Sequence, residues 1–592
     1  MYFLVYIGIL LYVGLKFITS ALPRLFLVPP HDWRDKIKKV IEHPKPIYLK
    51  VGSKRSAYRR RLVLASDAPA YYTNFVNNKL KISPDDAKSS DFEHLMKNRD
   101  VDDPHRRLVY GFFHPYANNG GGGERVLWLA VQATLMASDR NVVAIYTTNI
   151  DAQPKDILNK VQQKFQIEHL DGSRIVFIYL KKYGKFIDAN YWKHFTILGQ
   201  FFGSVVLALE AMYELSPDVW VDTIGLPASY FPVNFILKIP IMSYVHYPVL
   251  QPEMFGKLKF KDFSFNSFKT IKPSLQDVKE LGKLMYWSVL YYLYVYLGSL
   301  VDVTLTNGTW TNNHMQSIWS VNKSMGKKVD ILYPPCGEFI ETVDLVTKRE
   351  NKMLYIAQFR PEKRHVLILE KYSQFLQQNK KVSPKLIPSL VFLGSCRTAE
   401  DTATLVEVKS LASELDLDVE FVVDCSYEEV LSWLSRVKYG LNAMWNEHFG
   451  IGVVEYLSKG AVPLVHASAG PLLDIVTGWE DEQNKGKWHN NTGFFFKDST
   501  DPDYKGEVST EGFLVFDNES FPDFTQLLEE IIVKHPELSS DENLNKLRAN
   551  GQKLLQKFSN SEFVEQWVAH VGELQYLERS YRDKRTDIVR VY

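Results

Sequence analysis

Two glutamates eight positions apart, Glu447 and Glu455, are the strongest candidates for chemistry in this chain. Glu447 follows an apolar run at residues 439–443 and lies in a loop. Glu455 falls in a short predicted helix, about residues 451–458, among valine, tyrosine and leucine side chains. Placing a carboxylate among apolar neighbours costs free energy, so a carboxylate at such a position is more often functional or paired. A helix carboxylate placed here can bridge two vicinal hydroxyls of a ribose, and the loop carboxylate can contact a sugar. The alternative for a lone glutamate pair is surface charge.

A basic turn, Arg360-Pro361-Glu362-Lys363-Arg364, directly follows the predicted strand at residues 353–359. Basic side chains at the carboxyl end of a strand can meet a pyrophosphate. Taken alone, such a turn is more simply interpreted as solvated surface charge.

Four consecutive glycines, Gly120, Gly121, Gly122 and Gly123, stand between a predicted strand and a predicted helix. They let the backbone approach a ligand closely, and free N–H groups at a helix start favour an anion. The loop matches neither the dinucleotide fingerprint nor the phosphate loop of the nucleotide triphosphatases. The alternative is a flexible turn.

Histidines add weaker candidates. His246 ends an apolar strand at residues 239–246, where a hydrogen-bonded core histidine is the common outcome and the strand-end position favours function. His114 stands similarly after the strand at residues 108–113, and His448 flanks Glu447. No group of histidines, cysteines or carboxylates has the spacing of a metal site, so we expect no metal. No serine nucleophile motif is present either.

These residues need two scaffolds of alternating strands and helices, which imply parallel βαβ units. The first series of predicted strands covers residues 108–113, 141–147, 174–180, 218–222, 239–246 and 301–307. The second covers residues 353–359, 389–394, 420–423, 439–443 and 462–466. The pattern predicts an α/β protein with two Rossmann-like, doubly wound domains and a cleft between them as the place for a ligand.

The predicted domain boundaries follow from these series. Residues 106–340 form an N-terminal Rossmann-like domain and residues 341–570 a C-terminal one, followed by a helical tail at 571–592. Residues 29–105 contain a basic cluster at 54–61 and a polar stretch at 81–103, which predict a linker with an insertion, partly disordered.

Residues 1–28 predict a transmembrane anchor. The apolar run from Tyr2 to Leu22 reaches the ~20 residues that a span needs. No basic residue precedes it, as one would in a cleaved signal peptide, whereas Arg24 and several lysines follow it. The positive-inside rule then places the body of the chain in the cytosol. A second apolar stretch, residues 284–301, is interpreted as a helix that is buried or lies in the membrane interface.

The overall composition is that of a folded enzyme. Lys plus Arg number 70 and Asp plus Glu 69, and this balance gives no general attraction to nucleic acid. Three distant cysteines, Cys336, Cys396 and Cys425, fit a reducing compartment. Glycosylation sequons occur at Asn307, Asn322, Asn490 and Asn518, and chance is the simple explanation for them.

In this order the motifs resemble the retaining GT-B glycosyltransferases, family four of the sugar-nucleotide-dependent enzymes. The resemblance covers about residues 106–570 and rests on Glu447 and Glu455, followed by Gly460-Ala461-Val462-Pro463-Leu464-Val465 and Ala469-Gly470-Pro471. Lys363 matches the family's phosphate lysine. The family's arginine is replaced by Gln358, and Arg360 is a candidate for the missing charge.

A closer resemblance is to the α-1,2-mannosyltransferases of dolichol-linked oligosaccharide assembly. It rests on the N-terminal anchor and on four motifs: His114-Pro115-Tyr116-Ala117-Asn118-Asn119 with the glycines, Tyr244-Val245-His246-Tyr247-Pro248, Asn307-Gly308-Thr309-Trp310-Thr311 and Tyr333-Pro334-Pro335-Cys336. It implies GDP-mannose as donor, a dolichol-diphosphate oligosaccharide as acceptor and addition of the fourth and fifth mannoses for N-glycosylation. It also implies the cytosolic face of the endoplasmic reticulum membrane, other mannosyltransferases of the pathway as candidate partners, and no metal cofactor.

The resemblance also implies roles for the candidate residues. Lys363, aided by Arg360, neutralises the leaving diphosphate, and the glycine amides help to hold a phosphate or the acceptor. Glu455 and Gly450 belong to the donor site, with Glu455 on the ribose. Glu447 orients the mannose, His246 contacts it, and no residue acts as a nucleophile. Two alternatives stay open: a GT-B transferase that uses another sugar donor on a lipid-linked acceptor, and a non-catalytic membrane scaffold that retains the fold.

Overall fold

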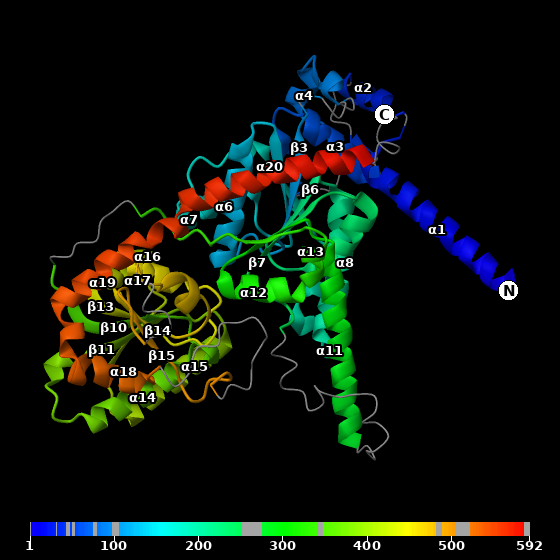
Figure 1. Cartoon of the computed structure of the whole chain (residues 1–592). Coiled ribbons are helices and arrows are strands. Elements are labelled where there is room, and N and C mark those ends of the chain that lie inside the picture. Colours follow the sequence, from blue (N-terminus) through cyan, green and yellow to red (C-terminus); the bar gives the residue numbers. More distant parts are fainter. Residues whose placement is uncertain are drawn as a thin grey trace. The chain divides into compact units, whose positions relative to one another are not determined.

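The computed structural model describes residues 2–30, 32–42, 48–49, 54–74, 80–96, 103, 106–251, 275–339, 347–480, 488–504 and 521–584. The chain divides into two compact units (Figure 1). The first unit comprises Met1–Thr306, His314–Leu332 and Val564–Tyr592. The second comprises Asn307–Asn313 and Tyr333–Phe563. Each unit is therefore assembled from segments that lie far apart in the sequence.

The first unit contains a seven-stranded parallel sheet with the order β5-β4-β3-β6-β7-β8-β9. Its strands are β3 (Leu108–Phe113), β4 (Asn141–Thr147), β5 (Ile175–Tyr179), β6 (Val219–Asp222), β7 (Ile241–Val245), β8 (Val303–Thr306) and β9 (Val329–Ile331). Every residue of β4, β5 and β7 is buried, as expected for strands covered on both faces. A small antiparallel pair, β1 (Tyr48–Leu49) and β2 (Leu80–Lys81), stands apart from this sheet.

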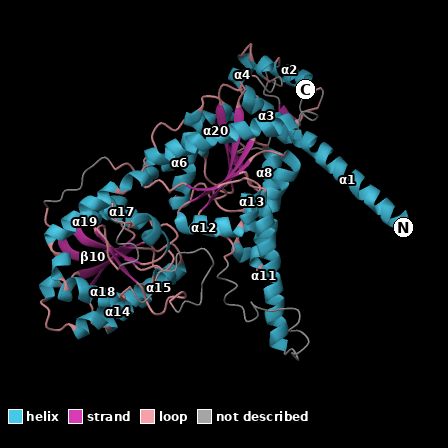
Figure 2. Cartoon of the chain, viewed as in Figure 1, coloured by secondary structure: helices cyan, strands magenta, loops and turns pink. Residues whose placement is uncertain are grey.

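Helices enclose the strands (Figure 2). Between residues 122 and 324, the helices of the first unit are α6 (Gly122–Ala137), α7 (Pro154–Phe165), α8 (Thr196–Glu214), α9 (Tyr230–Pro232), α11 (Leu275–Ser299) and α13 (Ser320–Ser324). Helix α12 (Thr309–Ile318) begins in the part of the chain assigned to the second unit and ends in the first.

The second unit contains a six-stranded parallel sheet with the order β12-β11-β10-β13-β14-β15. Its strands are β10 (Glu350–Ile356), β11 (Ser389–Gly394), β12 (Val419–Val423), β13 (Val437–Asn442), β14 (Val462–His466) and β15 (Phe494–Phe496). Its helices are α14 (His365–Gln378), α15 (Ala399–Glu414), α16 (Tyr427–Arg436), α17 (Ile451–Lys459), α18 (Phe524–Glu529) and α19 (Asp541–Lys553). Both sheets reverse strand order beside their first strand, which is the doubly wound topology. The predicted fold class is confirmed.

The segment predicted as a linker and insertion is, where described, built into the first unit. It contains α2 (Trp33–Ile41), α3 (Arg55–Ala65), α4 (Pro84–Lys88) and α5 (Phe92–Leu95). The basic cluster at 54–61 is not solvated: Arg55 and Arg59 each lie 2.8 Å from a carboxylate oxygen of Glu214 on α8. These arginines belong to the folded unit because Glu214, which lies far from them in the sequence, pairs with both. Residues 31, 43–47, 50–53, 75–79, 97–102 and 104–105 lie outside the described residues.

The predicted boundary at 570/571 falls inside helix α20 (Asn560–Lys584). From Val564 onward this helix belongs to the first unit. Trp567 Nε1 donates to Thr134 Oγ1 at 2.9 Å, and its ring stacks on Phe112 with centroids 6.2 Å apart. Tyr581 OH donates to Asp302 Oδ1 at 2.9 Å. Residues 585–592 of the predicted tail and 340–346 at the predicted domain boundary lie outside the described residues.

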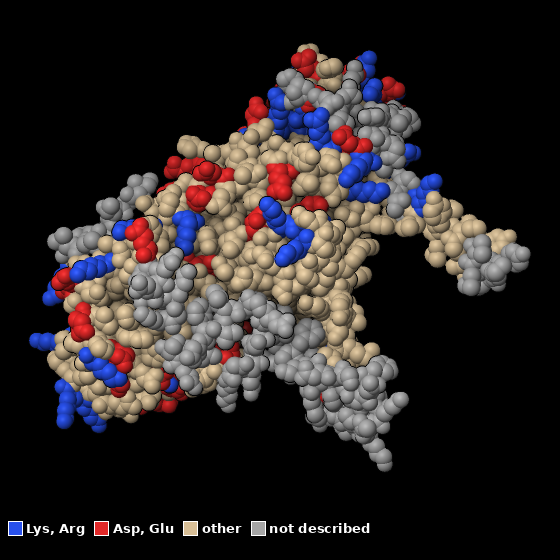
Figure 3. Space-filling model, in the orientation of Figure 1, with Lys and Arg blue, Asp and Glu red and all other residues tan. Residues whose placement is uncertain are grey.

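Helix α1 (Tyr2–Leu27) carries the predicted anchor. Among the described residues, two helices are long and apolar enough to span a membrane: α1 over Tyr6–Leu27, and α8. Half of the α8 stretch is buried in the protein but only 7% of the α1 stretch is, so α1 is the one that lacks a protein environment. Its only charged residues are Lys16 and Arg24, and the face of α1 seen in Figure 3 is largely uncharged.

The second apolar stretch, residues 284–301, lies mainly in α11. Leu290, Tyr294 and Leu297 of this helix are buried in the core of the first unit. Val289 and Tyr292 are exposed. The predicted helix is therefore confirmed, and it buries one face only.

Replacing Glu214 by Gln tests the buried pairing of α3 with α8. The change leaves Arg59, which is 1% exposed, without a counter-charge. Breaking a buried ion pair costs about 3–5 kcal/mol, so we expect a correspondingly lower free energy of unfolding for the detergent-solubilised protein. Glu542→Gln is the control, because its pair with Lys546 is exposed and surface pairs contribute at most about 1 kcal/mol. Equal effects of the two changes would contradict the buried pairing.

Candidate functional site

The second unit brings together Lys363 and Glu447. Lys363 ends the short turn Pro361–Lys363 after β10, and Glu447 lies in the loop between β13 and α17. Lys363 Nζ lies 2.5 Å from Glu447 Oε2, and the two side chains are 20% and 19% exposed. Their strands are neighbours in the parallel sheet, so their carboxyl ends lie side by side. The structure thus joins two residues that the sequence places 84 positions apart.

Lys363 is held by its surroundings as well as by Glu447. Its carbonyl oxygen accepts a hydrogen bond from Tyr355 OH at 2.5 Å, and its Nζ lies 3.0 Å from Met444 Sδ. The next residue, Arg364, has a left-handed backbone with φ 60°. These contacts fix both the backbone and the ammonium group of the lysine. Neither Tyr355 nor Met444 carries a motif that would have marked it in the sequence.

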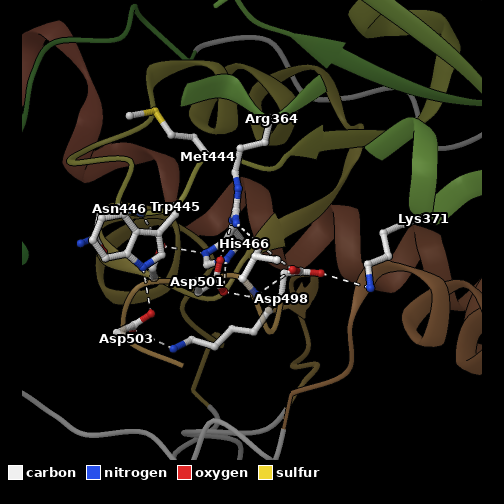
Figure 4. A network of polar contacts seen from close by, with 12 residues as sticks. Arg364, Lys371, Met444, Trp445, Asn446, His466, Asp498, Asp501 and Asp503 are labelled. Atoms are coloured by element: carbon white, nitrogen blue, oxygen red, sulfur yellow. Dashed lines mark hydrogen bonds and ion pairs between the residues drawn. The ribbon is translucent and has the colours of Figure 1, made fainter. Parts of the chain in front are cut away.

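A network of polar contacts fixes Arg364 and Trp445, which lie close in sequence to Lys363 and Glu447 (Figure 4). Arg364 points at Asp501, with Nη1 2.6 Å from Oδ1, and His466 Nε2 lies 2.8 Å from Oδ2 of the same carboxylate. Trp445, two residues before Glu447, donates from Nε1 to Asp503 at 2.9 Å. Burial raises the pKa of Asp501, but hydrogen bonds and the charges of His466 and Arg364 outweigh it and lower the pKa to about 2. Asp501 therefore stays a carboxylate.

The loop that carries Glu447 needs an unusual backbone. Gly450, predicted at the donor site, has φ 102° and forms the start of α17, a conformation that strains any other residue. Asn446 N donates to Ser468 Oγ at 2.9 Å, and Gly470 N donates to Glu447 O at 3.0 Å. Gly450 thus shapes the loop through its backbone.

Glu455 lies in α17 and is partly buried. Its neighbour Tyr456 attaches this helix to the sheet, because the tyrosine OH accepts from Ile356 N at 2.8 Å and donates to Leu441 O at 2.9 Å. Helix α17 and Glu455 are thereby fixed to the two strands that carry Lys363 and Glu447. The helix ends at Lys459, and the residue after it, Gly460, is left-handed with φ 76°.

Arg360 is engaged elsewhere. Its Nε lies 3.1 Å from Asp401 Oδ1, and Asp401 also caps the start of α15 together with Thr398. The arginine side chain is 39% exposed. The structure therefore links Arg360 to the start of α15, and its role in place of the arginine replaced by Gln358 stays a prediction.

The first unit gathers a second set of candidates at the carboxyl ends of β3, β6 and β7. Gly120 and Gly121 precede α6, and Gly122 and Gly123 form its first turn. A β-carbon on Gly123 would lie 3.6 Å from His246 Nε2, so the predicted glycines and histidine are close. His246 Nε2 also lies 3.1 Å from Thr223 O.

One predicted donor of this loop is already occupied. Glu124 Oε2 accepts from Gly121 N at 2.5 Å, and its Oε1 lies 3.5 Å from His114 Nε2. His114 Nδ1 in turn lies 2.8 Å from Thr223 Oγ1. The Gly121 amide is therefore not free for an anion, because the helix supplies its own carboxylate. The spacing from Gly121 to Glu124 is that of a capping box and could have identified Glu124, whereas no signal marks Thr223.

The electrostatics of this set favour neutral imidazole at His246. Burial lowers the pKa of His246 to about 4. Burial also raises the pKa of Glu124, but the neighbouring His114 and the hydrogen bond from Gly121 N outweigh this and lower it overall. At neutral pH His246 can therefore donate or accept a hydrogen bond without carrying a charge. Within the described residues no group of three or more His, Cys, Asp or Glu could hold a metal ion.

A further buried histidine, His365, directly follows the basic turn that contains Lys363. His365 begins α14 and is 2% exposed. Its ring lies 4.9 Å from that of Tyr355, 5.1 Å from Phe359 and 5.1 Å from Phe392. Neither ring nitrogen has a hydrogen-bond partner among the described residues. Burial, and next the charge of Lys363, lower its pKa from 6.5 to about 3.

This environment predicts a pH-dependent stability. Between pH 6.5 and about 3 the unfolded chain binds a proton at His365 and the folded chain does not, so stability falls as the pH falls. His365→Phe removes this proton uptake. Its stability relative to the parent should rise by about 2 kcal/mol between pH 8 and pH 5, measured by denaturant unfolding. A relative stability that is the same at both pH values would contradict the buried neutral imidazole.

Residues 107–319 match the family model described as ALG11 mannosyltransferase N-terminus, and residues 338–507 match the model described as Glycosyl transferases group 1. The chain is 56% identical to the GDP-Man:Man(3)GlcNAc(2)-PP-Dol alpha-1,2-mannosyltransferase of Debaryomyces hansenii, over 100% of both chains. It is 54% identical to the protein of the same name from Candida albicans, again over 100% of both chains.

Among solved structures, a glycosyltransferase from Rickettsia africae is similar to this chain. The similarity has a TM-score of 0.49 at 10% sequence identity and covers 79% of this chain and 98% of that one.

Proposed function

Because the chain belongs to the family of the GDP-Man:Man(3)GlcNAc(2)-PP-Dol alpha-1,2-mannosyltransferases, we propose that it transfers mannose from GDP-mannose to a dolichol-diphosphate-linked oligosaccharide. It is a glycosyltransferase of the GT-B class. In this proposal it adds the fourth and fifth mannoses in α-1,2 linkage, converting Man3GlcNAc2 to Man5GlcNAc2 for N-glycosylation. The observation that carries the proposal is the Lys363–Glu447 pair, fixed at the carboxyl ends of β10 and β13 beside α17 with Glu455.

The second unit holds the donor in this proposal. Lys363 neutralises the leaving diphosphate, and Glu455 binds the ribose hydroxyls. Lys363 Nζ lies 2.5 Å from Glu447 Oε2 in the ligand-free protein. When the diphosphate binds, it replaces the Glu447 carboxylate as the partner of Lys363. Glu447 is then available to orient the mannose. The rate gain comes from alignment and from stabilising the charge of the leaving group, so no enzyme nucleophile and no divalent metal are needed.

The first unit supplies the neutral imidazole of His246 and the amides of the glycine loop. Because burial lowers the pKa of His246 to about 4, its ring can accept or donate a hydrogen bond to a sugar hydroxyl without ionising near neutral pH. We assign His246 to contact the mannose and the remaining amides of Gly120, Gly122 and Gly123 to help hold a phosphate or the acceptor.

Helix α1 anchors the protein in the endoplasmic reticulum membrane in this proposal, with both units on the cytosolic side. The basic residues that follow the apolar run support this orientation. The sequons Asn307, Asn322 and Asn490 have buried side chains, which fits a body that is not glycosylated. Asn518 lies outside the described residues.

Removing the donor ligands tests the proposed function. Lys363→Ala and Glu455→Ala should each lower mannose transfer at least 100-fold, because the lysine acts on charge that develops in the transition state and the glutamate aligns the nucleotide. Transfer from labelled GDP-mannose to Man3GlcNAc2-PP-dolichol is measured, with linkage analysis of the product. Lys380→Ala, an exposed lysine of the same unit, is the control and should retain full activity. Unchanged turnover in both variants would contradict the assignment of these residues.

The same assay separates the alternatives. Transfer from another sugar nucleotide in place of GDP-mannose would identify a GT-B transferase of different donor specificity. A chain that binds no GDP and transfers no sugar would be a non-catalytic scaffold. Full activity in the presence of EDTA is the outcome expected for metal-independent transfer.

A charge in the middle of α1 tests the anchor. Leu11 is exposed on this helix, and an arginine at the centre of a membrane span costs about 2.5–3.5 kcal/mol on insertion. Leu11→Arg should move part of the protein from the carbonate-resistant membrane pellet into the supernatant. Leu11→Ile is the matched control and should stay in the pellet. Retention of the arginine variant to the same extent as the control would show that α1 is not the anchor.

A further inference from the structure

Three sequence motifs that the proposed function leaves unused meet at one buried carboxylate, Asp474. This residue lies in the single helical turn Pro471–Ile475 and is 1% exposed. It follows Ala469-Gly470-Pro471, and its partners come from the two chain segments around Thr309 and Tyr333. Both segments belong to the second unit.

Asp474 accepts three hydrogen bonds from these segments. Thr309 N donates to Oδ2 at 2.9 Å, Thr309 Oγ1 donates to Oδ1 at 2.5 Å, and Tyr333 OH donates to Oδ1 at 3.0 Å. Burial raises the pKa of Asp474, and these hydrogen bonds oppose that rise. A buried carboxylate is costly unless its oxygens are satisfied, so the three donors are what permit its position. The carboxylate in turn fixes Thr309 and Tyr333.

The same carboxylate is connected to the loop of Glu447 from two sides. On its own turn, Gly470 N donates to Glu447 O at 3.0 Å. The approach is so close that a β-carbon on Gly470 would lie 2.1 Å from Phe449 O. On the other side, Trp310 follows Thr309 and packs its ring 4.6 Å from that of His448, the residue after Glu447.

We propose that Asp474 is a positioning residue for Glu447, acting by holding Thr309 so that Trp310 packs against His448. Asp474 is buried and contacts protein donors, so it acts through these neighbours and does not touch the donor sugar. The inference rests on the proposed function, because it takes Glu447 as the group that orients the mannose. It assigns a purpose to Asn307-Gly308-Thr309-Trp310-Thr311 and Tyr333-Pro334-Pro335-Cys336 that nucleotide binding does not explain.

Asp474→Asn in the full-length protein tests the proposal. Asparagine has the same size, but its amide group can no longer accept from Thr309 at one of the two oxygen positions. We expect kcat for mannose transfer to fall about 10- to 100-fold, as for a lost alignment of the reacting groups, while KM for GDP-mannose changes less than threefold. A variant with parental kcat would overturn the proposal, and so would equal losses in kcat and in GDP affinity.

Two milder changes keep the test informative if the asparagine variant folds poorly. Thr309→Val removes the hydroxyl but keeps the backbone N–H and should lower kcat at least fivefold, whereas Thr309→Ser keeps both donors and should retain parental kcat. Tyr333→Phe removes the third donor and should give a smaller loss. If valine and serine variants lose kcat equally at unchanged melting temperature, the hydrogen bond to Asp474 does not position Glu447.

A double-mutant cycle separates positioning from general destabilisation. Asp474→Asn combined with Thr309→Val should lower kcat no further than Asp474→Asn alone, because both remove one connection. Multiplicative losses would overturn the proposal. If the parent protein transfers no mannose, the proposed function itself is contradicted. If the parent is active and the Asp474→Asn variant is equally active, only this inference is contradicted.

Discussion

Parallel pairing of the strands determines where chemistry can take place in this chain. Because neighbouring strands run in the same direction, the loops that follow them emerge at one edge of each sheet. In the first unit this edge gathers His114, Thr223 and His246 from the ends of β3, β6 and β7. In the second it gathers Lys363 and Glu447 from β10 and β13. In both sheets the strands concerned include the pair at which the strand order reverses.

At both edges the structure provides a carboxylate for the group that is expected to meet an anion. Glu124 accepts from the Gly121 amide, and Glu447 pairs with Lys363. A half-buried cation without a partner is costly, so these internal carboxylates stabilise the ligand-free site. In the proposed function the donor diphosphate takes the place of Glu447, so the free energy of donor binding depends on the difference between the two pairings of Lys363.

Much of the scaffold could be predicted, because buried parallel strands are continuous apolar runs: β3, β4, β11 and β14 have the predicted bounds. Lys363 and Glu447 each follow a predicted strand, but their ion pair depends on β10 and β13 being neighbours in the sheet, which only the structure shows. The sequence could not show that Arg59 and Glu214 are partners, because 155 residues separate them and only the fold makes the cluster buried. Nor could it show that Arg360 pairs with Asp401, since that contact depends on how the fold places the two side chains.

Helix α20 has a consequence for biosynthesis. It is the last helix among the described residues, yet Trp567 and Tyr581 pack into the unit that contains the N-terminal residues. While the ribosome is still making the second unit, the surface around Phe112 and Thr134 lacks its cover. The first sheet therefore lacks this cover until α20 has been synthesised, and apolar surface left uncovered in this way is prone to aggregation. A premature stop before Val564 would remove none of its strands and would still leave this unit unfinished.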